Sequence, residues 1–175
     1  GVVIPHETLI GPGFENEICV AMGAPLAGPG VTAADARAAI ATIAPSFELV
    51  ETRGVFVGHL ERVIPDNLQQ KGIIVGTPMQ LCDAPDLSEV ALTVTINKKV
   101  VDQATGDAVL GDPLNSVAWL ANKLSDHGRS LAAGELIMTG SFTKQHMIQK
   151  GDTITADFEG IGTVPWNQPC KIMFR

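Results

Sequence analysis

The sequence predicts an α+β protein that is rich in strands, in which a few helices flank a rolled or sandwiched mixed sheet. Short apolar segments separated by Gly and Pro recur along the chain, and only two segments have clear helical character. With 175 residues, of which 45% are hydrophobic, the chain can bury one sizeable core, and it shows no internal repeat or linker. We therefore expect a single domain over residues 1–175.

The first expected helix spans residues 32–44. Thr32 and Asp35 form a capping-box-like start in which Asp replaces the usual Glu. An alanine-rich run follows, and Pro45 is expected to end the helix because proline cannot continue it.

The second expected helix begins after Asp112, which can serve as its N-cap, and has Pro113 in its first position. It ends before Gly128. Apolar residues recur at helical spacing and predict a buried stripe, at Leu114, Val117, Ala118, Ala121 and Leu124.

Several strands are expected, and one pair forms a hairpin. Residues 90–96 alternate with a period of two, and Asn97-Lys98-Lys99 can turn the chain back into Val100-Val101. Further strands are expected over residues 135–138, 153–158 and 171–174.

Glu15 and Glu17 are the most informative polar residues in the sequence. On a strand, residues i and i+2 project from the same face, so both carboxylates can point at one place. Glu48, between Phe47 and Leu49, is a third candidate. Such close carboxylates repel one another unless a cation or protons neutralise them, and oxygen ligands favour Mg²⁺ or Mn²⁺ over zinc. The alternative is an ordinary solvent-exposed E-x-E pair.

Charge and composition exclude several classes of partner. The net charge of −7 and the lack of a Lys/Arg run argue against nucleic acid. No apolar run approaches the ~20 residues that cross a membrane. Cys19, Cys82 and Cys170 lack metal-site or disulfide-framework spacing, which indicates reduced thiols in a cytoplasmic protein.

The chain resembles the fumarylacetoacetate hydrolase superfamily, and most closely its 2-keto-4-pentenoate hydratase and 4-oxalocrotonate decarboxylase branch. The resemblance runs from Glu15 to Phe174, and its specificity comes from six short motifs that occur in the right order. These motifs are Glu15-Asn-Glu-Ile18 with the loop 26–32, Pro45-Ser-Phe-Glu-Leu-Val50, Asp66-Asn67, the segment 109–124, the segment 134–141, and Lys150-Gly-Asp-Thr-Ile154 leading to 160–164.

The resemblance implies a fold and a metal site. The fold is the family's mixed β-sandwich roll with a few flanking helices. Glu15, Glu17 and Glu48 occupy the family's metal-ligand positions, where Mg²⁺ or Mn²⁺ holds the carboxylate and 2-oxo group of the substrate. Family position selects Glu48 over the nearby Glu51 as the third ligand.

The resemblance also points to residues around this site. Asp66 and Asn67 match a pair at the family's active-site rim, although after Pro65 they are equally typical of a turn. Lys71, in a Lys-Gly context similar to the hydrolase branch, would stabilise developing negative charge or shuttle a proton. Its alternative is a solvated surface lysine.

Thr139, Gly140 and Ser141 resemble the family loop whose hydroxyl and backbone N–H groups hold the substrate carboxylate, and Ser141 matches best. The alternative is a Ser/Thr turn at a strand end. No G-x-S-x-G motif surrounds Ser141, so a serine nucleophile is not expected.

The implied activity is hydration of a 2-hydroxy-2,4-dienoate in the breakdown of aromatic or related compounds. A 4-oxalocrotonate-type decarboxylase and a C–C bond hydrolase of a diketo acid use the same electron sink and remain alternatives. An alternative of another class is a non-catalytic partner subunit, since hydratases and decarboxylases of this branch associate in some pathways. A homodimer or larger homo-oligomer is expected by resemblance.

The start of the sequence departs from the family pattern. Relatives carry an additional N-terminal segment that supplies a lid and a lysine near the substrate, whereas this sequence begins about where that segment ends. Either residues precede this sequence or the protein is naturally short, and in a short protein Lys71 is the expected replacement for the missing lysine.

Overall fold

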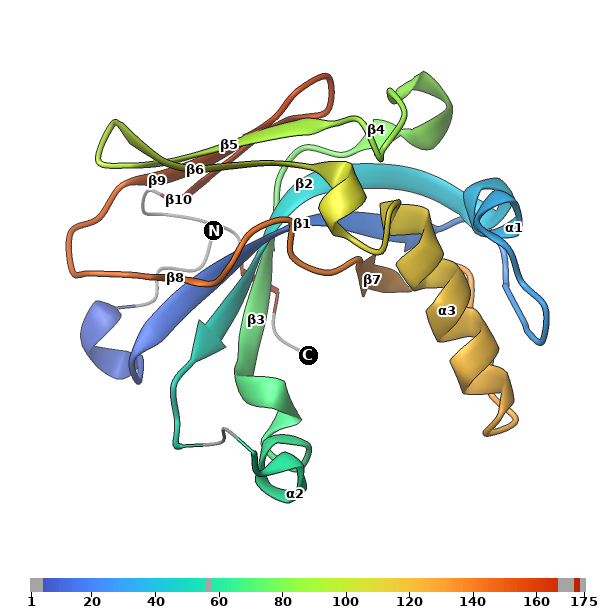
Figure 1. The fold of residues 1–175 in the computed structure, drawn as a ribbon, viewed down its shortest axis with the longest axis horizontal. Coiled ribbons are helices and arrows are strands. Elements are labelled where there is room, and N and C mark those ends of the chain that lie inside the picture. Colours follow the sequence, from blue (N-terminus) through green and yellow to red (C-terminus); the bar gives the residue numbers. More distant parts are fainter. Residues whose placement is uncertain (1–4, 56–57, 167–171, 174–175) are drawn as a thin grey trace.

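Two antiparallel sheets form the framework of the protein (Figure 1). The computed structural model describes residues 5–55, 58–166 and 172–173. The larger sheet has seven strands with the order β11-β3-β2-β1-β7, and β4 and β8 pair with β2 and β1. Its strands are β1 (Pro12–Met22), β2 (Ile40–Glu51), β3 (Gln70–Val75), β4 (Met79–Gln80), β7 (Leu136–Met138), β8 (His146–Met147) and β11 (Ile172–Met173).

The smaller sheet lies across one face of the larger one and has four strands with the order β10-β9-β5-β6. These strands are β5 (Ala91–Ile96), β6 (Lys99–Thr105), β9 (Ile154–Phe158) and β10 (Gly162–Trp166). The α-helices are α1 (Ala33–Ala39), α2 (Leu60–Val63) and α3 (Pro113–Ser125), and short 3₁₀ helices occur at His6–Thr8, Asn67–Gln69, Leu81–Asp83 and Gly106–Ala108. In Figure 1, α1 and α3 lie together beyond one end of β1 and β2.

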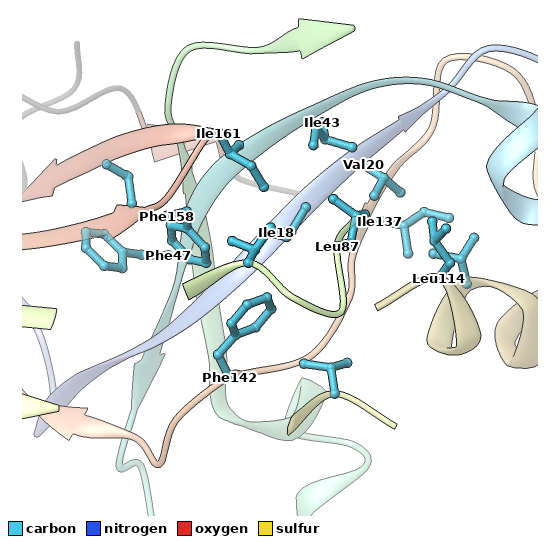
Figure 2. Close-up of a cluster of buried hydrophobic side chains, with 14 of the residues drawn as sticks. Ile18, Val20, Ile43, Phe47, Leu87, Leu114, Ile137, Phe142, Phe158 and Ile161 are labelled. Atoms are coloured by element: carbon cyan, nitrogen blue, oxygen red, sulfur yellow. The ribbon is translucent and has the colours of Figure 1, made fainter. Parts of the chain in front are cut away.

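The hydrophobic core fills the space between the two sheets (Figure 2). Phe47 from β2 and Phe158 from β9 are fully buried there, and Phe142 meets Phe158 edge to face with ring centroids 5.3 Å apart. Ile18 and Val20 of β1 point into the same core. Because side chains alternate along a strand, Glu15 and Glu17 project from the opposite face of the large sheet. The core thus fixes the direction of both carboxylates.

The expected fold class is confirmed, and so are most of its elements. The Val90–Ile96 segment and its return strand form the β5–β6 hairpin, whose turn residues Asn97 and Lys98 have φ of 52° and 66°. Strands 135–138 and 153–158 appear as β7 and β9. Within 171–174, Ile172 and Met173 form β11, while Lys171 and Phe174 lie outside the described residues. The described strand pairs are all antiparallel, so the parallel pairs that a mixed sheet would contain do not occur among them.

The helix expected over residues 32–44 is wrong in its second half. The capping box of Thr32 and Asp35 forms as expected, but α1 ends at Ala39 and β2 begins at Ile40. The β-branched residues that follow pair with β1 instead, and Pro45 sits inside β2 opposite Ile18. Tertiary pairing with a long strand therefore outweighs the helical preference of the alanines.

Two sequence expectations concern the environment of the protein. Within residues 5–55, 58–166 and 172–173, no helix combines the length and the apolar character needed to span a bilayer. Cys19 is buried on β1 and Cys82 is exposed, while Cys170 lies outside the described residues. The cytoplasmic location remains a prediction.

The N-cap of α3 provides a test of its local stability. The Asp112 carboxylate accepts a hydrogen bond from the Leu114 N–H at 2.7 Å, and Pro113 follows at the first helical position. We expect Asp112→Ala to lower the free energy of unfolding by about 0.5–2 kcal/mol, because a cap acceptor is lost, and Asp112→Asn to change it far less. Urea unfolding of both variants measures the difference, and equal losses in the two would contradict this role.

Candidate metal and substrate site

Three carboxylates meet on the open face of the large sheet. Glu15 on β1 lies directly opposite Glu48 on β2, and Glu17 is two residues further along β1. One carboxylate oxygen from each of the three lies within 4.8 Å of the others. The i, i+2 spacing and the antiparallel register thus bring together the three ligands expected from the sequence.

Burial makes this cluster of negative charge unfavourable without a cation. Glu17 is only 3% exposed, and Glu15 and Glu48 are half-buried. The pKa of Glu17 is raised to about 8: burial is the largest cause, the charges of Glu48 and Glu15 add to it, and the Gly140 N–H acts in the opposite direction. The pKa values of Glu15 and Glu48 are also raised, mainly by burial.

Gly140 fixes the orientation of Glu17. Its backbone N–H donates a 2.7 Å hydrogen bond to Glu17 Oε2, and its φ of +104° is readily accessible only to glycine. One oxygen of Glu17 is therefore tied to the loop after β7, which leaves the other to point toward Glu15 and Glu48.

Thr139 and Ser141, on either side of Gly140, attach the same loop to β1. The Thr139 hydroxyl donates to the Ile18 carbonyl at 2.9 Å. The Ser141 hydroxyl accepts from the Asn16 N–H at 3.1 Å and donates to the Asn16 carbonyl at 3.5 Å. These hydroxyls hold the loop against the strand that carries two of the carboxylates, and their role in holding a substrate carboxylate remains a prediction.

Gln70 is a residue of this site that the sequence reasoning missed. Its side chain lies near the Glu48 carboxylate and lowers the pKa of Glu48, against the larger effect of burial. A bulge produces this placement, because Leu49 pairs with Gly72 whereas Val50 pairs with Gln70, so that Lys71 is left out of register. Nothing in a single sequence signals that bulge.

The structure places Lys71 and Asp66 in ion pairs rather than at the carboxylates. Lys71 Nζ lies 3.4 Å from Glu51 Oε2, and Asp66 accepts two 3.1 Å hydrogen bonds from Arg53 Nε. Asn67 is exposed and donates to Gln70 Oε1 at 3.1 Å. The predicted catalytic roles of Lys71 and Asp66 and the predicted substrate contact of Asn67 remain untested.

A cavity of about 630 Å³ opens on the same face of the sheet. Ile73 on β3, which lines it, is the strand partner of Glu48, and Met138 on β7, which also lines it, is the partner of Cys19 two residues beyond Glu17. Paired residues point to the same face, so Ile73 and Met138 lie on the face that carries the carboxylates, although none of the three glutamates is itself among the lining residues. The remaining lining of the cavity is mixed: apolar side chains come from Leu120, Leu124, Leu131, Leu136 and Ile137, and polar ones from Gln70, Arg129, Ser130 and Glu135, with Gly72 and Gly134 between them.

The donor set fits a hard divalent cation. All three candidate ligands offer carboxylate oxygen, and no other cluster of His, Cys, Asp or Glu with metal-site spacing occurs in the part of the chain that the structure describes. A cation would offset both the burial of these carboxylates, which is the main cause of their raised pKa values, and the repulsion that adds to it at Glu17 and Glu48.

Comparison with known proteins defines the family. The family model for the fumarylacetoacetate (FAA) hydrolase C-terminal region matches residues 1–166. The chain belongs to this family. A 4-oxalocrotonate decarboxylase of Pseudomonas putida is 38% identical over 165 residues, which cover 94% of this chain and 62% of the relative. A 2-hydroxyhexa-2,4-dienoate hydratase of Comamonas testosteroni is 34% identical over 95% of this chain and 61% of its own length. The chain thus spans about three-fifths of these relatives.

Solved structures of this FAA hydrolase family share the fold and include bound divalent metals. The 4-oxalocrotonate decarboxylase from Pseudomonas putida G7, complexed with calcium and acetate, matches with a TM-score of 0.86 and 37% identity, over 94% of this chain and 62% of that one. A second structure of that decarboxylase holds magnesium and adipate and matches with a TM-score of 0.82 and 36% identity, over 91% and 61% of the two chains. Both of these similar structures therefore contain a divalent metal, calcium in one and magnesium in the other.

The raised pKa of Glu17 predicts how pH affects the metal-free protein. Between the ordinary value of 4.5 and about 8, the folded state holds a proton that the unfolded chain releases. Stability should therefore be greatest below pH 4.5 for this group and should fall as pH rises to 8, by at most about 1.4 kcal/mol per pH unit.

Urea unfolding in chelator at pH 5.5 and 7.5 measures this slope. We expect Glu17→Gln to make the dependence of stability on pH less steep, because the amide does not titrate. In samples with Mn²⁺ in place of the chelator, we expect stability at the higher pH to be restored. The same slope in wild-type protein and in the variant would contradict the assignment.

Proposed function

We propose that this chain carries a metal-dependent lyase site that hydrates a 2-hydroxy-2,4-dienoate. The observation that carries the proposal is the cluster of Glu15, Glu17 and Glu48, whose carboxylate oxygens lie within 4.8 Å of one another. The hydratase and decarboxylase relatives support this class of substrate. Because the chain spans about three-fifths of those relatives, the activity of the whole relatives is carried over to this chain only as a proposal.

The proposed chemistry divides between a cation and the protein. Mg²⁺ or Mn²⁺, held by the three glutamates, would act as a Lewis acid that stabilises negative charge on a 2-oxo acid. Gly140 holds Glu17 and Gln70 holds Glu48, so the carboxylates keep their positions. The apolar side chains that line the cavity would pack against the hydrocarbon part of the dienoate.

Proton transfer requires a group beyond these ligands. Lys71 and Asp66 are the proposed candidates by family resemblance. Each would first have to separate from its ion-pair partner, Glu51 or Arg53. Thr139, Gly140 and Ser141 are proposed to lie near the substrate carboxylate, and Asn67 at the rim.

Decarboxylation of a 4-oxalocrotonate-type acid is the second candidate. It is favoured by one observation, the 38% identity to the Pseudomonas putida decarboxylase, which exceeds the 34% to the Comamonas testosteroni hydratase. Both reactions draw electrons toward the same 2-oxo group, so the glutamate cluster serves either one. The product separates them, because only decarboxylation releases carbon dioxide.

Assembly is part of the proposal. We infer a homodimer or larger homo-oligomer, and an association with a pathway decarboxylase or hydratase, from family resemblance alone. Light scattering on the purified protein gives the oligomeric state directly.

The proposed activity is tested by following the ultraviolet absorbance of 2-hydroxypenta-2,4-dienoate with purified protein. We expect loss of the dienol that requires Mg²⁺ or Mn²⁺ and yields 4-hydroxy-2-oxopentanoate. Glu17→Gln should lower kcat/KM at least 100-fold, because it removes a buried ligand charge.

Glu159→Gln, an exposed acid on the β9–β10 turn, is the matched control and should leave turnover unchanged. A parallel assay with 4-oxalocrotonate measures carbon dioxide. Release of carbon dioxide without dienol hydration would select the second candidate, and metal-independent turnover would contradict both.

A further inference from the structure

A left-handed turn precedes β3 and contains no glycine. Asn67, Leu68 and Gln69 have φ of 55°, 53° and 66°. Side chains of L-residues crowd the backbone in this region, so three such residues in succession are strained. A strained conformation persists only where the surrounding structure holds it, and such segments concentrate at functional sites.

Arg53 holds this turn from both ends. Its Nη2 donates to the Asp66 carbonyl at 2.8 Å and to the Gln70 carbonyl at 3.3 Å, and these two carbonyls bracket the left-handed residues. Its Nε donates to both oxygens of the Asp66 carboxylate at 3.1 Å. One guanidinium therefore fixes the distance between the start of the turn and its end.

The guanidinium is itself anchored to β2. Arg53 Nη1 donates to Glu51 Oε2 at 3.0 Å, and Glu51 is only 2% exposed. Glu51 also accepts from the Ile10 N–H at 3.1 Å and pairs with Lys71 at 3.4 Å. The clamp is thus attached to the strand that carries Glu48.

The turn places Gln70 beside the candidate metal site. The bulge places Gln70 opposite Val50, on the face of β2 that carries Glu48, and Gln70 lines the cavity. Asn67 Nδ2 donates to Gln70 Oε1 at 3.1 Å, which leaves the amide N–H₂ of Gln70 to face the Glu48 carboxylate.

We propose that Arg53 is a positioning residue that clamps the left-handed turn 66–70, so that Gln70 orients Glu48 for cation binding. This inference rests on the metal site of the proposed function. The cluster of Arg53, Glu51 and Asp66 lies on the far side of β2 from Glu48, and the inference gives it a role at the site. The inference also explains why the turn keeps a strained backbone. Partners that orient a ligand in this way are typically worth 10- to 100-fold in metal affinity.

A double-mutant cycle read out by Mn²⁺ affinity tests the proposal. Calorimetric titration of Mn²⁺ compares wild-type protein with Gln70→Ala, Arg53→Met and the double variant. We expect Gln70→Ala to weaken Mn²⁺ binding 10- to 100-fold and Arg53→Met to weaken it nearly as much. The Mn²⁺ affinity of the double variant should stay within about threefold of that of Gln70→Ala. Non-additivity is the signature of two residues that act through one contact.

Arg62→Met is the matched control. Arg62 lies in α2, its side chain is 62% exposed, and its Nε is 3.9 Å from Glu61, so Mn²⁺ affinity should stay within twofold of wild type. Circular dichroism checks that each variant is folded. If Arg53→Met does not fold, Arg53→Lys replaces it in the cycle, because lysine keeps the charge beside Glu51 but cannot bridge both carbonyls.

The outcomes separate this inference from the proposed activity. Additive losses in the double variant, unchanged affinity in Gln70→Ala, or no Mn²⁺ binding by wild-type protein would overturn the clamp. Tight Mn²⁺ binding with the expected non-additivity but without turnover of either substrate would support the clamp and reject the proposed reaction.

Discussion

The repulsion among three carboxylates on one face of the β1–β2 pair is the constraint on which the rest of the site depends. Glu15 and Glu48 are cross-strand partners, and like charges in that position destabilise a sheet. The protein nevertheless buries Glu17 two residues further along β1, where the Gly140 N–H donates a hydrogen bond to its carboxylate. Such an arrangement is stable when a cation supplies the missing positive charge or when a proton neutralises Glu17, whose raised pKa favours the protonated form.

The framework that holds these carboxylates was largely predictable where its signals are local. The alternation of residues 90–96, the Asp112-Pro113 start of α3 and the E-x-E spacing of β1 each depend on a few neighbouring residues, and each appears as expected. The end of α1 was not predictable in this way. Ile40 and Ile43 leave the helical pattern because β1 offers them a long antiparallel partner, and Pro45 is tolerated inside β2.

In the candidate site, too, the residues set by local sequence were predictable and those set by distant strand pairing were not. Period-two spacing placed Glu15 and Glu17, and family position selected Glu48, so the carboxylate cluster followed from the sequence, while its role in metal binding stays a prediction. Gln70 did not, because its direction depends on a bulge between β2 and β3 and on left-handed residues that are not glycines. The same bulge turns Lys71 toward Glu51, an outcome that the Lys-Gly context could not indicate. Non-local register therefore decides which side chains of the 66–72 segment reach the site.

The two acidic residues of β2 show why one of them suits a metal and the other does not. Burial raises the pKa of Glu51, but the Ile10 N–H, Arg53 and Lys71 together outweigh it and leave that pKa lowered. Glu48 has no ion pair with Lys or Arg within the described residues, and its pKa stays raised. Glu51 is thus neutralised by the protein, whereas Glu48 still needs a positive partner. Arg53 and Lys71 both pair with Glu51 on the far face of β2, so neither of them neutralises Glu48, and that carboxylate can still take up an added cation.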